Sequence, residues 1–267
     1  ERFENELRED AIARFEEFLR RYPDEPKFTP DAVFRLAELY FEQANNQYLV
    51  AMEKYEKKVA EYDKGNIREE PSMPRQRYDK TVALYDRLIR DFPEYRHIDG
   101  AYYLSGYCLS EQGEDEKAVR FFTKLIEEKP KSRFVPEAWL RIGEYYFDYN
   151  ELDKALEAYG SVVQHKDSPY FDKALYKLAW TYYRKDGFDN AVKKFIELVE
   201  FADKEKKEKG KSGSELRAES IQYLAISFAE EDWDGDGLPD PTTGLQRAIQ
   251  YLSAIRDKPF VQEIYRK

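Results

Sequence analysis

The sequence predicts an all-α protein built from repeated pairs of antiparallel helices. Its 267 residues include 22 Tyr and 17 Phe but only 12 Gly, and large aromatic side chains with few glycines suit packed helices better than turn-rich sheets. A pattern of small residue, aromatic residue and closing proline also recurs along the chain, most clearly between Asp99 and Lys131. These observations indicate short helices that cannot bury their apolar sides alone and therefore stack on their neighbours.

Each position of this stretch has a physical reason. Gly106 and Ala118 are small because two antiparallel helices cross there, and Gly113 supplies the turn between them. Pro130 ends the second helix because proline lacks an N–H and clashes with the preceding turn. The stretch resembles the tetratricopeptide repeat (TPR), a helix–turn–helix of roughly 34 residues. The resemblance implies a right-handed α-solenoid of antiparallel helix pairs.

The same pattern predicts one solenoid over residues 1–267. Three of its anchor alanines, Ala118, Ala155 and Ala191, recur at intervals of 37 and 36 residues. We expect a partial repeat over 1–29, a repeat with a helical insertion over 30–98, regular repeats over 99–135, 136–171 and 172–217, a repeat with an acidic loop at 230–242 over 218–257, and the start of a further repeat over 258–267.

The insertion at about 45–76 carries an apolar stripe with steps of four and three residues, which is typical of a coiled-coil helix. Two geometries fit it. The helix continues unbroken from Asp31 to Tyr62, about 48 Å at 1.5 Å per residue, and the loop returns alongside it. Alternatively, the chain bends near Asn45 and the stripe folds back. The stripe is either satisfied within the chain or docks another subunit through residues 45–62. Its members are Tyr48, Met52, Tyr55, Val59 and Tyr62.

Composition and charge exclude several classes of function. The net charge of −10 and the pI of about 5.1 argue against nucleic acid as the main partner. Cys108 is the only cysteine, so there is no internal disulfide, and its place in a predicted helix indicates a buried side chain rather than a nucleophile. His97 and His165 stand at links between repeats without a nucleophile at a suggestive spacing, so we expect no enzyme activity. The basic cluster from Lys204 to Lys211 is interpreted as a solvated loop.

An acidic loop is the one metal-like constellation in the sequence. Its spacing resembles the calcium loops of EF-hands and thrombospondin type 3 repeats, in which aspartates converge around a tight turn. Position twelve is Thr243, where an EF-hand has a bidentate glutamate, so we expect weaker binding unless Glu230, Glu231 or another segment completes the shell. The alternative is a solvated acidic turn. The expected ligands of a structural Ca²⁺ are Asp232, Asp234, Asp236, the carbonyl of Leu238, and Asp240.

A second candidate surface follows from the TPR resemblance. In TPR proteins the first helix of each pair lines a concave groove, and here the corresponding side chains are mostly aromatic. Exposed aromatics at such density mark recognition sites, and they would suit a peptide with apolar or proline anchors and basic character. The alternative is that tight winding buries them between neighbouring first helices. The expected partner-binding residues are Phe34, Phe41, Tyr103, Tyr107, Leu140, Phe147, Tyr176, Trp180 and Tyr183.

The linker from Pro130 to Ala138 resembles the envelope-associated TPR proteins of Gram-negative bacteria, such as BamD-like lipoproteins and TolA-binding periplasmic proteins. The acidic loop adds a resemblance to gliding-motility TPR proteins. Because the repeat pattern is already under way at Glu1, we expect this sequence to be part of a longer protein. Whether a signal peptide or lipid anchor precedes Glu1 stays open at this point. No apolar run reaches the roughly 18 residues that cross a bilayer.

These resemblances imply a non-catalytic scaffold or adaptor that binds protein partners in a multiprotein complex. They place it in the bacterial periplasm or at the outer-membrane periphery, with the cytoplasm as the alternative. A calcium-regulated peptide-binding module is the rival function.

Overall fold

The computed structural model describes residues 2–210 and 214–267, and all regular secondary structure in these two stretches is helical. None of the described helices is both long and apolar enough to cross a membrane. The helices are α1 (Arg2–Arg21), α2 (Thr29–Asp63), α3 (Asp79–Asp91), α4 (Ile98–Glu111), α5 (Asp115–Glu128), α6 (Val135–Asp148), α7 (Leu152–Val162), α8 (Phe171–Arg184), α9 (Phe188–Lys209), α10 (Arg217–Ala229), α11 (Gly244–Leu252), the 3₁₀ helix η1 (Ser253–Ile255) and α12 (Pro259–Tyr265).

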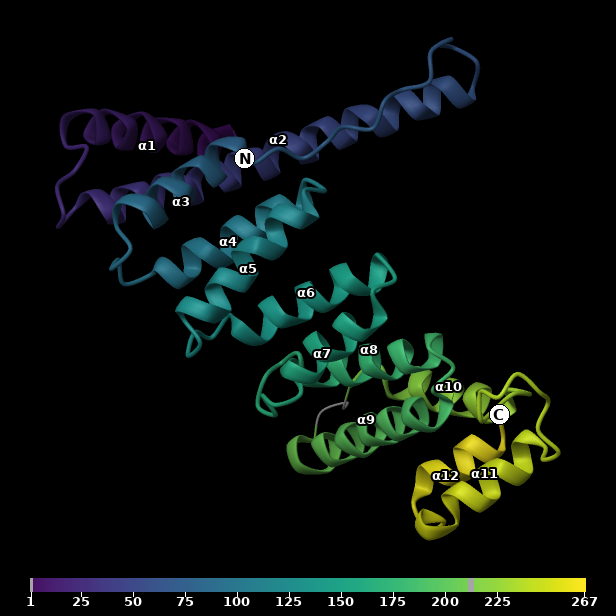
Figure 1. The fold of residues 1–267 in the computed structure, drawn as a ribbon. Coiled ribbons are helices and arrows are strands. Elements are labelled where there is room, and N and C mark those ends of the chain that lie inside the picture. Colours follow the sequence, from purple (N-terminus) through teal and green to yellow (C-terminus); the bar gives the residue numbers. More distant parts are fainter. Residues whose placement is uncertain (1, 211–213) are drawn as a thin grey trace. The chain divides into compact units, whose positions relative to one another are not determined.

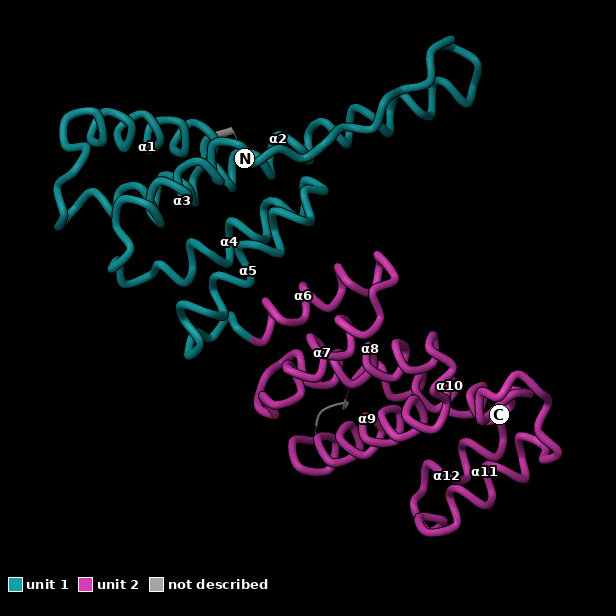
Figure 2. Tube along the Cα trace, viewed as in Figure 1, with its two compact units in different colours: residues 1–135 teal, residues 136–267 magenta. Residues whose placement is uncertain are grey.

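The chain forms two compact units, residues 1–135 and 136–267 (Figure 2). In unit 1, α1 packs on α2, α2 on α3, α3 on α4 and α4 on α5. In unit 2, α7 packs on α8, α8 on α9 and α9 on α10, and α10 contacts both α11 and α12. The predicted fold class, an all-α series of antiparallel helix pairs, is confirmed (Figure 1).

The predicted helix crossings depend on glycine. A Cβ built on Gly106 of α4 would stand 2.6 Å from the ring of Phe122 on α5. A Cβ on Gly143 of α6 would stand 2.5 Å from the ring of Tyr159 on α7. Real Cβ atoms do not approach other atoms so closely, so each glycine lets an aromatic ring lie directly on the backbone of the facing helix.

Left-handed residues end the first helix of three consecutive pairs. They are Gly113 (φ 77°), Asn150 (φ 59°) and Asp186 (φ 57°), at intervals of 37 and 36 residues. A left-handed residue directly after a helix allows its last carbonyls to accept hydrogen bonds from the following backbone N–H groups. Asn and Asp adopt this conformation more readily than other non-glycine residues. The turn therefore repeats in shape although only the first of the three residues is glycine.

Of the two geometries predicted for the insertion, the structure has the unbroken one. Helix α2 runs through Asn45 without a bend, and residues 64–78 return beside it (Figure 1). The second half of α2, from Asn45 on, and this returning segment are here called the arm. Asn45 holds this return: its Oδ1 accepts hydrogen bonds from Gln76 Nε2 and from the hydroxyl of Tyr78, each at 2.6 Å. Tyr55 of the stripe faces Pro71 and Pro74 of the returning segment across a small cleft.

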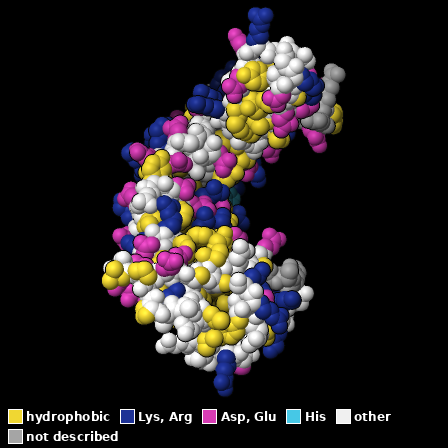
Figure 3. Space-filling view, turned by 90° about the vertical axis from the view of Figure 1, so that its right-hand side faces the viewer, with side chains coloured by type: hydrophobic (Ala, Val, Ile, Leu, Met, Phe, Trp, Pro, Cys, Tyr) yellow, Lys and Arg dark blue, Asp and Glu magenta, His cyan; other side chains and the backbone are white. Residues whose placement is uncertain are grey.

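The return segment covers the stripe only in part. Tyr48, Met52, Tyr55 and Val59 are half-buried, whereas Tyr62 is exposed. Other hydrophobic side chains of the arm are exposed as well, and in Figure 3 such side chains gather among charged ones at the upper end of the view. These residues are Leu49, Val50, Ile67 and Met73.

The basic cluster is not a loop over the part that the structure describes, so that expectation is wrong. Helix α9 continues to Lys209, and Lys209 Nζ pairs with Glu205 at 2.6 Å one turn earlier. Alternating Lys and Glu are good helix formers that pair at this spacing, so they extend a helix even where it buries little. Residues 211–213, the end of the cluster, lie outside the described residues.

The thiol of Cys108 lies in the core of unit 1 with no exposed surface. Burial raises its pKa to about 12, and the nearby Glu111 carboxylate adds to the shift. Because the thiolate is the reactive form, we expect the folded protein to resist a thiol reagent at pH 8. Following the thiol colorimetrically with and without denaturant checks this, and rapid reaction of the folded protein would contradict it.

Candidate functional site

Four aromatic side chains of unit 2 form a cluster on α8 and α10, here called the aromatic cluster: Tyr176, Trp180, Tyr183 and Tyr223. The first three follow one face of α8 at steps of four and three residues. The Trp180 ring packs edge-on against Tyr223 of α10, with centroids 4.4 Å apart, and lies 5.4 Å from the Tyr183 ring. All four side chains are half-buried, so each also presents surface to the solvent.

Two carboxylates border the aromatic cluster. The Tyr176 hydroxyl donates to Glu219 Oε1 at 2.7 Å, and the Tyr183 hydroxyl donates to the carboxylate of Glu230. Burial and these hydrogen bonds raise the pKa of each tyrosine to about 12. Both hydroxyls therefore stay protonated at neutral pH and act as donors to the two glutamates.

A cavity of about 1050 Å³ lies next to the aromatic cluster, and Tyr176 lines both. Tyr170, Phe201 and Leu216 provide apolar walls, and Lys173 is among the charged residues at the edge. A cavity of this size and mixed lining is large enough for several residues of a bound peptide.

The acidic loop between α10 and α11 brings three of the predicted ligands together. Asp232, Asp234 and Asp236 each offer a carboxylate oxygen, and these oxygens lie within 4.8 Å of one another. Gly237, with φ 86°, reverses the backbone, and its N–H donates to Asp232 Oδ2 at 3.0 Å. The other oxygen of this side chain, Asp232 Oδ1, is buried and has no hydrogen-bond partner among the described residues.

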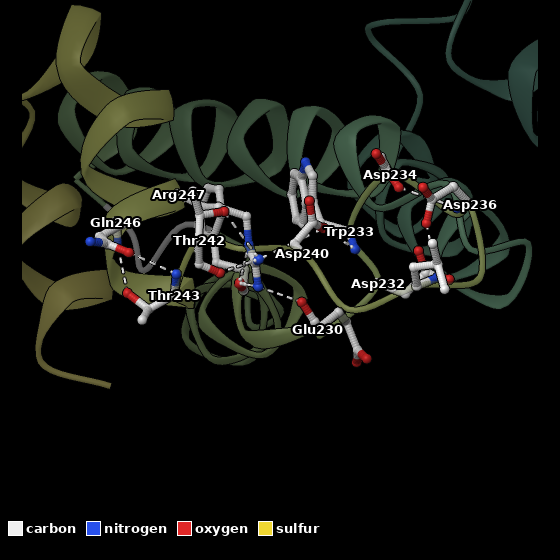
Figure 4. A network of polar contacts seen from close by, with 12 residues as sticks. Glu230, Asp232, Trp233, Asp234, Asp236, Asp240, Thr242, Thr243, Gln246 and Arg247 are labelled. Atoms are coloured by element: carbon white, nitrogen blue, oxygen red, sulfur yellow. Dashed lines mark hydrogen bonds and ion pairs between the residues drawn. The ribbon is translucent and has the colours of Figure 1, made fainter.

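Asp240 stands apart from the other three aspartates, contrary to its predicted role as a ligand. Its Oδ2 accepts the N–H of Trp233 at 2.7 Å and lies 3.8 Å from Arg247 Nη1 (Figure 4). The N–H of Asp240 also donates to Glu231 O at 2.7 Å. These contacts hold the Asp240 side chain at the neck of the loop, away from the three clustered carboxylates.

Two family models described as tetratricopeptide repeat match the sequence, one at residues 100–132 and 173–201 and the other at residues 1–66. The chain therefore carries tetratricopeptide repeats at these residues. These matches coincide with helices α1–α2, α4–α5 and α8–α9. A search of curated proteins found no match.

Two solved structures share the fold. The C-terminal part of a TPR repeat-containing protein from Cytophaga hutchinsonii matches with a TM-score of 0.54 at 15% identity, over 94% of this chain and 77% of that one. The apo form of RapI matches with a TM-score of 0.53 at 14% identity, over 99% of this chain and 69% of that one. At these identities the likeness concerns the fold alone.

The TPR positions predicted to contact a partner differ between the units. In unit 2, Tyr176, Trp180 and Tyr183 join the aromatic cluster. Phe147 is half-buried, and the guanidinium carbon of Arg184 lies 4.4 Å from the centroid of the Phe147 ring. Leu140, in contrast, is buried in the core among residues of α7 and α8. Leu140 is therefore corrected to a core residue.

In unit 1 the predicted TPR contact residues pack on other aromatic rings of the same unit. Phe41 stacks on Tyr78 with ring centroids 5.0 Å apart and lies 6.1 Å from Tyr107. Half-buried Phe34 contacts the ring of Tyr85. Tyr103 is buried and is corrected to a core residue; its ring stacks on Phe134 at 4.7 Å. Winding of neighbouring helices thus takes up much of this aromatic surface.

Sequence reasoning missed two residues that hold the acidic loop. Trp233 anchors it to the core, because its ring stacks on Phe228 at 5.4 Å and on Phe188 at 6.1 Å. Arg247 is buried on α11 and donates to the carbonyl of Thr242 at 2.7 Å and to that of Phe228 at 2.8 Å. The tryptophan was a usable signal, since a large aromatic inside an acidic loop needs an apolar contact.

Proposed function

We propose that this protein is a non-catalytic scaffold that binds a polypeptide segment of a partner at the aromatic cluster of unit 2. TPR proteins generally mediate protein–protein interactions, and the aromatic cluster is the observation that carries the proposal for this chain. Glu219 and Glu230 hold the Tyr176 and Tyr183 rings through hydrogen bonds, so these two side chains lose little conformational entropy on binding. Half-exposed Tyr and Trp side chains are the residue types that dominate binding energy at interfaces.

The chemistry of this surface favours a segment with apolar or proline anchors and basic side chains. The rings accept apolar groups and cations, since a ring face attracts a positive charge. Glu219 and Glu230 supply negative charge at the edge, within a chain of net charge −10. The adjoining cavity of about 1050 Å³ gives such a segment room to continue.

Affinity for a peptide selected from a random library tests this proposal. We expect Trp180→Ala to weaken binding by roughly tenfold or more, because truncation of a central aromatic anchor commonly costs at least 1–2 kcal/mol. Tyr149→Ala is the matched control, since Tyr149 is an exposed aromatic of the same unit that lies outside the aromatic cluster. Equal affinities of the wild type and Trp180→Ala, with both variants folded by circular dichroism, would contradict the proposal.

The proposed place of action is an assembly in the bacterial cell envelope, as a periplasmic or outer-membrane-associated subunit. The support is the resemblance of the linker after Pro130, in which the hydroxyl of Ser132 donates to Asp99 Oδ2 at 2.7 Å. Fractionation of the source cells tests this location, and recovery in the cytoplasmic fraction alone would exclude it.

The arm is proposed as a further surface for another subunit. Exposed Leu49 and Met73 support this, because large apolar side chains on a projecting element are costly in water and are typical of contact sites. Replacing both residues by serine tests the proposal. If the double variant recovers the same partner subunits as the wild type when each is purified with its bound proteins, the result would oppose it.

A calcium-binding role for the acidic loop is the second candidate. It is favoured by the buried, unpartnered Asp232 Oδ1 beside the carboxylates of Asp234 and Asp236. Two carboxylates about 4 Å apart repel by up to roughly 4 kcal/mol at an effective dielectric of 20, and a cation converts this repulsion into attraction. Asp232, Asp234, Asp236 and the carbonyl of Leu238 would hold the ion, while Asp240 braces the neck.

We expect millimolar Ca²⁺ to raise the free energy of unfolding by about 1–2 kcal/mol, if its affinity resembles that of extracellular calcium modules. The melting temperature should then rise by a few degrees, and chelation should reverse the rise. Asp234→Asn should abolish the shift, whereas Asp257→Asn, at an exposed position outside the loop, should retain it. The absence of any shift in the wild type would exclude the site.

The two candidate functions meet at Glu230, which joins the acidic loop to Tyr183 of the aromatic cluster. Calcium regulation of peptide binding therefore has a physical route. Peptide affinity with Ca²⁺ and with chelator separates the functions: a plain scaffold shows equal affinities, and a calcium-regulated module does not.

A further inference from the structure

The returning segment of the arm has the chemistry that the aromatic cluster of unit 2 favours in a partner. Residues 71–77 read Pro-Ser-Met-Pro-Arg-Gln-Arg, with two prolines, one methionine, two arginines and no carboxylate. They form no helix or turn. The partner segment proposed above has apolar or proline anchors and basic side chains, and residues 71–77 supply both within a chain of net charge −10.

Every second side chain of this segment lies on its outer side. Met73, Arg75 and Arg77 are exposed, Met73 at 61%, whereas Pro74 and Gln76 between them are half-buried. This alternation is that of an extended chain, in which successive side chains lie on opposite sides. The three exposed side chains, here called the outer row, therefore extend over about 13 Å at 3.3 Å per residue.

The arm holds the outer row in place before any contact with a partner. Gln76 Nε2 donates to Asn45 Oδ1 at 2.6 Å, and Pro71 and Pro74 line a small cleft against α2. The buried residues of α2 end at Tyr40, and Figure 1 shows the arm extending beyond the other helices of unit 1. A segment that is already ordered and exposed loses less conformational entropy when it binds.

The outer row and the aromatic cluster match in length and in charge. From Tyr176 to Tyr183 the cluster covers about 11 Å of α8. Methionine makes favourable contacts with aromatic rings, and arginine both stacks on rings and pairs with carboxylates. The cluster offers these carboxylates at its border, in exposed Glu219 and half-buried Glu230. The row thus brings one apolar side chain for the rings and two cations for the glutamates.

We propose that residues 71–77 of one copy of this chain bind the aromatic cluster of a second copy, with Met73 on the rings of Trp180 and Tyr223 and Arg75 beside one of the two glutamates. The inference rests on the proposed function and names its partner segment. The arm belongs to unit 1 and the cluster to unit 2, so the contact is head-to-tail. A copy that gives its arm still offers its own cluster, and such contacts build rings or open chains of copies.

A synthetic peptide of residues 71–77, with acetylated and amidated ends, tests the contact. We expect the wild type to bind it and Trp180→Ala to bind it roughly tenfold more weakly or worse. Glu219→Lys, a change at an exposed position, should also weaken binding and serves if Trp180→Ala does not fold. A library-selected peptide is the reference. If the wild type binds that peptide but not the 71–77 peptide, the inference fails and the proposed function stands; if Trp180→Ala binds the library-selected peptide as the wild type does, the proposed function itself fails.

Mixing two variants tests the head-to-tail geometry. Met73→Glu with Arg75→Glu disables the outer row, and Trp180→Ala disables the cluster, so neither variant alone should associate in sedimentation equilibrium. An equimolar mixture should form a 1:1 dimer and nothing larger, because it keeps one working arm and one working cluster. The wild type should form larger species as its concentration rises. Arg68→Glu, an exposed change in the returning segment outside the outer row, should behave as the wild type does.

Three results would overturn the inference. The first is a wild type that stays monomeric at the highest concentration reached, which also covers an arm that binds within its own copy. The second is self-association that Trp180→Ala retains while the arm variant loses it, since the arms would then bind each other. The third is a mixture of the two variants that forms no dimer although the wild type associates.

Discussion

Arg247→Met is expected to lower the free energy of unfolding by about 3–5 kcal/mol, the cost of breaking a buried charged network by removing one partner. The Arg247 side chain is 9% exposed, and its guanidinium donates to the carbonyls of Phe228, Glu230 and Thr242. The first of these carbonyls lies in the last turn of α10, and the other two lie at the two ends of the acidic loop. Methionine fills a similar volume but leaves these carbonyls without their donor and the Asp240 carboxylate without its ion-pair partner.

Chemical denaturation followed by circular dichroism measures this loss. Arg247→Lys should recover a minority of it, because a single ammonium cannot reach three carbonyls that a guanidinium fork can. Arg256→Met is the control, since Arg256 is exposed, and a change within about 0.5 kcal/mol is expected there. Equal stabilities of Arg247→Met and Arg256→Met would show that the network does not hold the loop.

Gly143→Ala is expected to lower the free energy of unfolding by about 1–3 kcal/mol, the usual cost of overpacking a core. The new Cβ would stand 2.5 Å from the Tyr159 ring, which is fully buried. In a helix interior, alanine is otherwise favoured over glycine by about 1 kcal/mol. The steric cost therefore has to exceed the gain in helix propensity, and the rigid ring offers little room to relax.

Gly160→Ala separates the two effects. Gly160 lies in α7, next to Tyr159, and a Cβ there meets nothing within 4 Å. This variant should be more stable than the wild type by about 0.5–1 kcal/mol. Opposite signs for the two variants in thermal and denaturant unfolding are the expected result. Stabilisation by both substitutions would mean that α6 and α7 do not cross at Gly143.

The helix pairs were predictable because their determinants are local. A small residue, an aromatic residue and a terminating proline at fixed spacing act within one repeat, so Gly106, Phe122 and Pro130 identify their structural roles without knowledge of the rest. Asn150 and Asp186 occupy the position of Gly113, and the interval of 36–37 residues is the signal for them rather than residue type.

Features that depend on distant contacts were not predictable. Asp240 fits the spacing of a calcium loop, but Trp233 N–H and Arg247 hold it at the neck. Leu140 and Tyr103 fit the positions of groove residues, but neighbouring helices bury them. In each case the sequence pattern places the residue on the correct helix or loop, and competition among tertiary partners decides where its side chain lies.

The most direct test of a partner site at the aromatic cluster is amide hydrogen exchange with and without a saturating, library-selected peptide. The account predicts added protection in residues 171–184 and 217–229, the helices that carry Trp180 and Tyr223, and loss of that protection in Trp180→Ala. Protection confined to other helices would contradict it.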